Sequence, residues 1–100
     1  MDPGLQIAQA LHASREFRDI YPQIDELWYK HSNYVAILQV ADLTALKSLM
    51  YRLQENGIKF VSFREPDLDN ELTALCVEPG TKSRKLLSSL PLALKQYKNR

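Results

Sequence analysis

Residues 34–40 have the sequence Tyr-Val-Ala-Ile-Leu-Gln-Val, which is nearly continuous in apolar side chains. Val35, Ile37 and Val40 are β-branched, and such residues favour the extended backbone of a strand. An apolar run of this length without regular polar alternation is typical of a strand that is covered on both faces. We therefore expect this segment to lie at the centre of a small sheet with helices above and below it.

A helix is predicted directly after this segment. Asp42 supplies a side-chain acceptor for the first turn, and Asn56-Gly57 supplies the left-handed conformation that commonly ends a helix. Between these positions the apolar residues alternate spacings of three and four, namely Leu43, Leu46, Met50 and Leu53. Because a second strand follows at residues 58–63, we expect the helix to form a right-handed crossover between two parallel strands.

A hairpin is predicted in the second half of the chain. Residues 58–63 alternate in strand fashion, and residues 72–77 form another apolar strand. The segment between them is rich in proline, aspartate and asparagine, which are typical turn residues. The two strands could therefore pair with each other.

Three further helices are predicted, two before the central segment and one after the hairpin. The first two begin at prolines, which are favoured in the first turn because their missing N–H has no helical partner. The last can be capped by Thr81 or Ser83 and should be kinked or ended by Pro91. Their approximate bounds are residues 3–15, 22–30 and 83–90.

These elements predict a single α/β domain over residues 1–100, with a small mixed sheet and helices on both of its faces. Three strands are visible in the pattern. A strand covered on both faces needs neighbours on both sides, so the pattern also indicates a fourth strand that the sequence does not display. Residues 95–100 are expected to form a basic tail.

Composition and charge are those of an ordinary globular domain. The chain has 100 residues, of which 45% are hydrophobic, and its net charge of +1 gives no overall electrostatic footprint for nucleic acid. A chain of this size buries a modest share of its surface, so we expect a homodimer. The single cysteine, Cys76, favours a reducing compartment and hence the cytoplasm. No leader and no membrane span are expected, because the apolar runs are short.

Two stretches resemble a known family. Residues 4–13, Gly-Leu-Gln-Ile-Ala-Gln-Ala-Leu-His-Ala, resemble the Gly-Lys-x-x-Ala-Gln-x-x-His-Ala segment that opens the first helix of the type-2 peptidyl-tRNA hydrolases. Residues 63–67, Phe-Arg-Glu-Pro-Asp, and 71–75, Glu-Leu-Thr-Ala-Leu, are similar to the acidic loop and the threonine-bearing strand of the short bacterial and phage members. Residues 35–57 fit the strand and helix that the family places between these stretches.

The resemblance covers the chain from Gly4 to about Leu94 and implies a four-stranded sheet flanked by helices. The sequence departs from the family pattern in two places. In the family a strand precedes the first helix, whereas this chain begins at Met1, where that strand would already have ended, so the first strand is expected to be absent. The lysine of the family motif is replaced by Leu5, which cannot supply a positive charge.

The resemblance also implies a site for hydrolysis of the ester between a peptide and the tRNA ribose. His12, Glu65 and Asp67 would be catalytic, with His12 positioning or deprotonating water because histidine titrates near neutral pH. Gln9 and Thr73 would bind the substrate through their amide and hydroxyl groups. Three cations near the end of the chain would contact tRNA phosphates: Lys82, Arg84 and Lys85.

Each of these residues also has a structural alternative. His12 could pack against the sheet, and Gln9 could be an exposed helix glutamine. Asp67 could cap its own loop, and Thr73 could be present for its strand propensity. The cations could form a solvated helix face. Cys76 lies in an apolar strand and is interpreted as a core residue.

Two functional hypotheses follow. The first is a peptidyl-tRNA hydrolase-like protein, either active or a degenerate descendant of such an enzyme. The second is a non-catalytic module that holds a nucleotide or RNA in the same pocket. The sequence has no metal-ligand spacing, phosphate-binding loop or Ser-His-Asp order, so no metal and no cofactor are expected. The expected partners are tRNA or a nucleotide, and a second copy of the chain.

Overall fold

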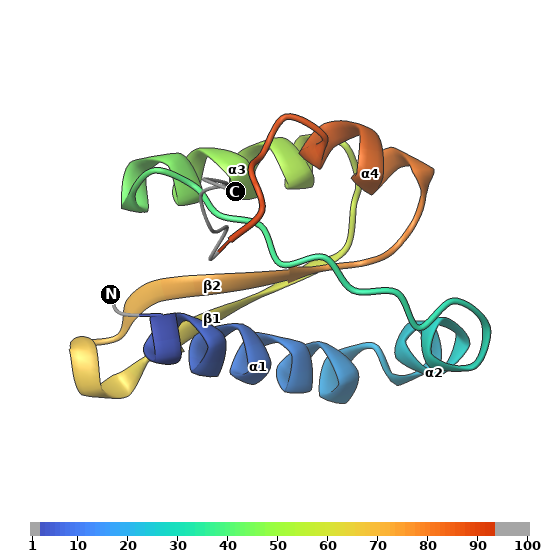
Figure 1. The fold of residues 1–100 in the computed structure, drawn as a ribbon, viewed down its shortest axis with the longest axis horizontal. Helices are drawn as coiled ribbons and strands as arrows, with labels where there is room; N and C mark the ends of the chain where they lie inside the picture. Colours follow the sequence, from blue (N-terminus) through green and yellow to red (C-terminus); the bar gives the residue numbers. More distant parts are fainter. Residues whose placement is uncertain (1–2, 94–100) are drawn as a thin grey trace, which may run out of the picture.

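The computed structural model of this chain describes residues 3–93. Those residues form four α-helices, one short 3-10 helix and two strands (Figure 1). Their bounds in chain order are α1 Pro3–Ile20, α2 Pro22–His31, α3 Leu43–Glu55, β1 Phe60–Glu65, η1 Pro66–Leu68, β2 Glu71–Val77 and α4 Thr81–Leu87. The predicted mixed α/β class is confirmed in this general form.

The hairpin of β1 and β2 lies between two helical layers. In Figure 1, α1 packs along one face of both strands, and α3 and α4 lie over the opposite face. α2 packs against α1 at one end of the molecule. The prediction of helices on both faces of the sheet is therefore confirmed.

One group of buried apolar side chains lies between the sheet and α3. Leu49 and Leu53 of α3 form its centre together with Ile58. Partly buried apolar residues pack around them: Val40, Phe60, Leu75, Val77, Leu86, Leu87 and Leu90. On the other face of the sheet, Ala13 and Phe17 of α1 are buried. Residues four apart share one face of a helix, so these two form the inner stripe of α1.

The helix ends follow the local signals at α3 and depart from them elsewhere. The Asp42 carboxylate accepts the Ala45 N–H at 2.9 Å, and Gly57 has a φ of +67°, so both ends of α3 are confirmed. α1 continues more than a turn beyond its predicted end, because Phe17 adds another buried position to its inner face. α4 is shorter than predicted and ends at Leu87.

The predicted hairpin is confirmed, and its two strands are antiparallel. Its register has one irregularity. Phe63 pairs with Ala74, whereas Arg64 pairs with Leu72, so that Thr73 has no partner on β1. One extra residue in a strand is a β-bulge, which bends the strand and redirects side chains.

Residues 34–40 correct the predicted sheet. They form no strand, and the sheet of the described residues has two strands instead of three, without a parallel crossover. A single antiparallel bridge joins Leu38 to Leu92, and the side chains of Tyr34 and Val35 are 76% and 62% exposed. The apolar pattern indicates a preference for burial, but a strand also needs a neighbour for its backbone, and within residues 3–93 this segment has only the short bridge.

Two further expectations from the sequence concern membrane-spanning helices and the tail at residues 95–100. None of the described helices combines the length and the apolar character needed to cross a membrane. The predicted basic tail at residues 95–100 lies outside the described residues.

The first testable consequence concerns the core. Leu53 is fully buried, so Leu53→Ala should lower the free energy of unfolding by about 2–5 kcal/mol through lost burial and the cavity left behind. Tyr51→Ala, two residues away in the same helix, removes a side chain that is 67% exposed and should change the free energy of unfolding by less than about 0.5 kcal/mol. Chemical denaturation measures both values. Equal effects of the two substitutions would contradict this description of the core.

Candidate functional site

A buried glutamine joins α1 to both strands of the hairpin. Gln9 lies one turn before Ala13 on the inner face of α1 and is 2% exposed. Its Nε2 donates to Oε1 of Glu65 at 2.7 Å, and its Oε1 accepts from the hydroxyl of Thr73 at 2.8 Å. Both ends of the amide are therefore engaged, as a buried polar group requires.

The β-bulge explains how Thr73 reaches this position. Thr73 is the extra residue of β2, so its side chain is released from the regular alternation of the strand. Its hydroxyl also lies 3.4 Å from the carbonyl oxygen of Phe63, a second and weaker acceptor. The bulge thus directs a polar group toward α1 from a strand whose neighbouring residues are apolar.

Glu65 is held at the point where β1 passes into η1. Its Oε2 accepts the backbone N–H of Asp67 at 3.3 Å, while its Oε1 accepts from Gln9. The hydrogen bond from Gln9, followed by that from Asp67, lowers the pKa of Glu65 below its ordinary value of 4.5, and the charge of His12 adds to this effect. The carboxylate is therefore ionised at neutral pH and fixed in orientation.

His12 lies beside this carboxylate on the exposed side of α1. Its ring stacks on Phe63, with the ring centroids 4.9 Å apart and the planes at 22°. The charge of its ring is the weakest of the effects that lower the pKa of Glu65. An exposed imidazole and an oriented carboxylate in one region of the surface can act as a general base and as a charge that stabilises its protonated form.

The structure thus brings together four of the residues that the sequence predicts for the site. Gln9, Glu65 and Thr73 form one hydrogen-bonded group, which we call the Gln9 cluster, and His12 lies at its edge. Asp67 contributes its backbone N–H to the cluster, while its side chain is exposed. The alternative of an exposed Gln9 is wrong, and Gln9 has instead a buried, linking position.

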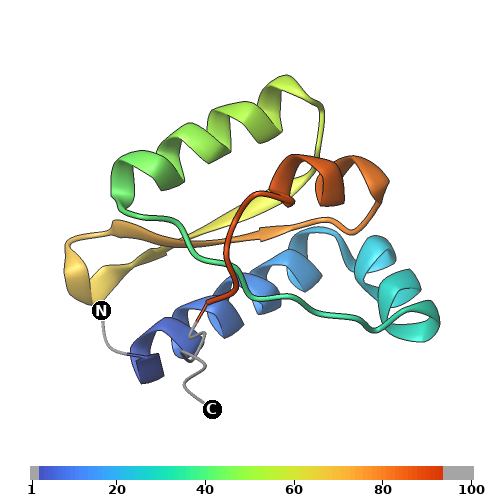
Figure 2. The ribbon, with the colours of Figure 1, turned by 45° about the horizontal axis from the view of Figure 1, so that its top comes forward.

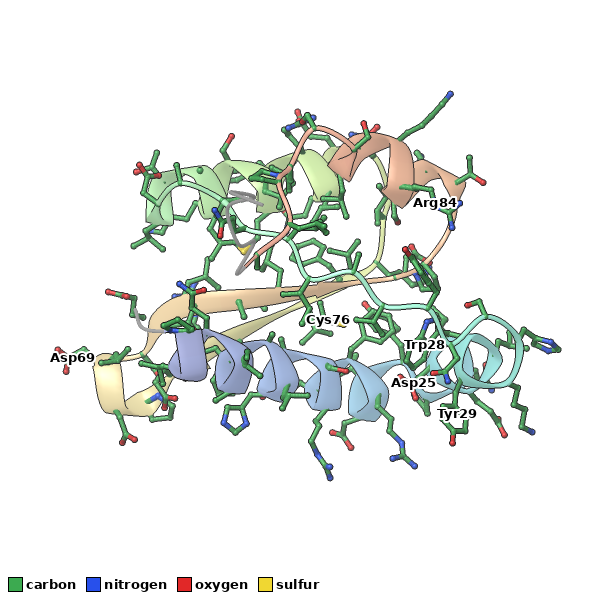
Figure 3. The ribbon with its side chains drawn as sticks, viewed as in Figure 1. Asp25, Trp28, Tyr29, Asp69, Cys76 and Arg84 are labelled. Atoms are coloured by element: carbon green, nitrogen blue, oxygen red, sulfur yellow. The ribbon has the colours of Figure 1, made fainter. Side chains whose placement is uncertain are left out.

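Three predicted residues lie elsewhere. Lys82, Arg84 and Lys85 belong to α4, which is across the sheet from α1. Figure 3 labels Arg84 at the opposite end of the molecule from Asp69, which belongs to the turn that follows η1 beside Glu65. These cations therefore do not line the Gln9 cluster.

Phe63 is the residue at this site that sequence reasoning did not select. It supports the ring of His12 and offers its carbonyl oxygen to Thr73. The only sequence signal for it is its place in the strand that precedes Glu65. An aromatic side chain in a strand is common in cores, so the stacking follows from the packing of α1 and not from the pattern.

Cys76 is half-buried on β2. Burial, and to a lesser degree the charge of Asp25, raise the pKa of its thiol to about 11. A thiol with this pKa is protonated at neutral pH and is a poor nucleophile. Within residues 3–93, no group of histidine, cysteine and carboxylate side chains is arranged to hold a metal ion.

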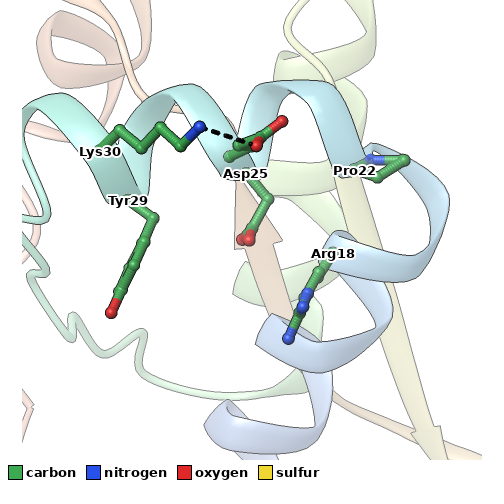
Figure 4. Close-up of a pocket in the computed structure, with 6 residues that line it drawn as sticks. Arg18, Pro22, Asp25, Tyr29 and Lys30 are labelled. Atoms are coloured by element: carbon green, nitrogen blue, oxygen red, sulfur yellow. Dashed lines mark ion pairs between the residues drawn. The ribbon is translucent and has the colours of Figure 1, made fainter.

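A surface hollow of about 670 Å³ lies at the junction of α1 and α2 (Figure 4). Arg18, Asp25 and Tyr29 line it, and a pair of exposed side chains, Lys30 and Glu26, forms an ion pair of 3.1 Å at its rim. None of the residues predicted for the site lies in it. The hollow is open, and both positive and negative side chains line it. The Gln9 cluster with His12 contains residues predicted for the site, so it is the better candidate.

Comparison of the sequence with protein-family models gave no match, and comparison with curated proteins also gave none. The resemblance to the type-2 peptidyl-tRNA hydrolases therefore depends on the residues quoted above and on their arrangement.

The Gln9 cluster should contribute to stability. Gln9→Ala removes a buried amide and leaves Glu65 Oε1 and the hydroxyl of Thr73 without this partner, so we expect the free energy of unfolding to fall by about 1–3 kcal/mol. Gln23 is an exposed glutamine of α2, so Gln23→Ala is the matched control and should change the free energy of unfolding by less than about 0.5 kcal/mol. Chemical denaturation gives both values, and a neutral Gln9→Ala would exclude a structural role for the cluster.

The pKa of Glu65 provides an independent measurement. In Gln9→Ala it should rise toward 4.5, because the largest cause of its lowering is removed. A lowered pKa in the folded state stabilises the fold above the unfolded-state value and loses this effect as the pH falls through the folded-state value. The free energy of unfolding should thus depend less on acid pH in Glu65→Gln. An NMR titration of the carboxyl carbon tests the shift, and an unchanged pKa in Gln9→Ala would contradict it.

Proposed function

We propose that this chain is a peptidyl-tRNA hydrolase-like protein that acts on the ester between a peptide and tRNA. One observation carries the proposal. Residues nominated from two separate motifs, 56 and 64 positions apart in sequence, are joined directly by hydrogen bonds of 2.7 and 2.8 Å. Convergence of this kind is what a site requires, and it does not follow from the secondary structure alone.

In the proposed reaction, His12 removes a proton from water as the water oxygen attacks the ester carbonyl carbon. The bond from that carbon to the ribose oxygen then breaks, and the protonated His12 returns the proton to the departing ribose oxygen. The carboxylate of Glu65 stabilises the cationic imidazole through its charge. Gln9 is a positioning residue, because it is 2% exposed and the two ends of its amide hold Glu65 and Thr73.

We propose that Lys82, Arg84 and Lys85 contact tRNA phosphates that lie far from the ester. These side chains are exposed on α4, and α4 packs over the other face of the sheet. A tRNA is large enough to reach both faces of a molecule whose extents are 39 × 37 × 25 Å. The Asp67 carboxylate is exposed and stays a candidate for contact with the ribose.

Leu5 favours a second candidate function, a non-catalytic module that holds tRNA or a nucleotide. Leu5 lies one turn before Gln9 on α1 and is 38% exposed. In the motif it stands where the family has a lysine, and its side chain is uncharged. A charged donor near a developing oxyanion commonly accounts for a factor of about 10²–10³ in rate. Without it, the same residues could bind the substrate while turning it over slowly.

Hydrolysis of an N-acetyl-aminoacyl-tRNA separates the two candidates. His12→Ala should reduce release of the N-acetyl amino acid by a factor of about 10²–10⁴, because it removes the general base. His31→Ala removes an exposed histidine at the end of α2 and is the matched control, with unchanged release expected. Leu5→Lys should increase release by a factor of about 10 or more, since it places a cation near the ester.

Other outcomes of these measurements would exclude one or both candidate functions. Release that is the same in wild type and His12→Ala would remove the hydrolase proposal. If tRNA then raises the melting temperature saturably, the binding module is the better description, because a ligand of the folded state stabilises it by mass action. Absence of both cleavage and stabilisation would exclude both candidates.

A further inference from the structure

Residues 34–40 combine a strand-type sequence with a conformation that leaves them largely unpaired. The segment passes from α2 to α3 beside the sheet without joining it (Figure 2). Tyr34, Val35 and Ile37 expose 76%, 62% and 43% of their surface. Leu92, which the short bridge joins to Leu38, exposes 54%. Local preference and observed environment disagree here, and natural sequences usually avoid such a conflict.

The sheet has an equally unsatisfied edge. β2 pairs with β1 on one side only, and within the described residues no strand lies on its other side. β2 contains no proline, and its one charged side chain, Glu71, is at its first residue. β1 likewise carries its charges, Arg64 and Glu65, at its last two residues. Charges and prolines are usual devices that keep an exposed strand edge from pairing, and residues 72–77 have neither.

We propose that a second copy of this chain completes the sheet, with residues 34–40 of each copy pairing along the open edge of β2 in the other. Backbone N–H and C=O groups of the two segments would form the ladder, and the exposed side chains of Tyr34, Val35 and Ile37 would be buried in the interface. The partner is thus an extended apolar strand, supplied by the same sequence.

A second copy fits better than an unrelated protein because the two unsatisfied features are reciprocal. Each copy offers the free side of residues 34–40 and the open edge of β2, so a two-fold axis satisfies both at once. Two seven-residue segments per copy and Leu92 are fewer than the about 20–30 residues that a stable interface of standard size uses on each side. The arrangement is therefore a modest dimer and not an obligate one.

Sedimentation equilibrium of the full chain tests the proposal. The wild type should form a dimer that dissociates on dilution, and Val35→Lys should raise the dissociation constant about tenfold or more, because it buries an unpaired charge in the ladder. Leu11→Lys is the matched control: Leu11 is 60% exposed on α1, against 62% for Val35, and its substitution should leave the dimer unchanged. Circular dichroism at low concentration should show that both variants stay folded, since both sites are exposed.

A synthetic peptide with the sequence of residues 33–41 tests the backbone pairing separately. It should compete for the edge of β2 and convert dimer to monomer, whereas the same peptide with alternate amides methylated should not. A wild type that stays monomeric at its highest soluble concentration would overturn the proposal, even if the peptide bound. Equal weakening by Val35→Lys and Leu11→Lys, or equal competition by the two peptides, would also overturn it.

Discussion

The antiparallel pairing of β1 with β2 is the interaction on which the rest of this structure depends. α1 packs on one face of the hairpin, and α3 and α4 lie over the other, so both helical layers share one narrow support. The side chains that fill each layer are placed by the alternation of two strands only. Loss of this pairing would therefore remove, at the same time, the surface on which Leu53 and its neighbours pack and the surface on which the inner face of α1 packs.

A single irregularity in that pairing places polar chemistry within an apolar scaffold. The extra residue at Thr73 directs a hydroxyl toward α1, where Gln9 receives it and in turn holds Glu65. A buried polar group costs free energy unless it is fully hydrogen-bonded, and each group here has its partner. The cluster thus fixes the relative position of helix and hairpin, and it leaves an oriented carboxylate beside His12.

Local signals predicted α3 and the hairpin, since a cap, a left-handed stop and a turn act over a few residues. They failed at residues 34–40, where the strongest strand pattern in the chain forms a single bridge within the part of the chain that the structure describes. Resemblance selected Gln9, Glu65 and Thr73 for the site, yet the hydrogen bonds among them could not be predicted, because the bulge that directs Thr73 has no sequence signature of its own. The stacking of His12 on Phe63 was likewise missed.

The sequence by itself determined the mixed α/β class, the helices on both faces, the capped α3 and the hairpin. Periodicity and capping carry that information because they depend on neighbours within a turn or two. The residues of the candidate site were selected by the family resemblance instead. Only the tertiary structure decided the number of strands, the separation of Lys82, Arg84 and Lys85 from Gln9, and the burial of Gln9 itself. Those features depend on which distant backbone or side chain lies alongside, and no local pattern encodes it.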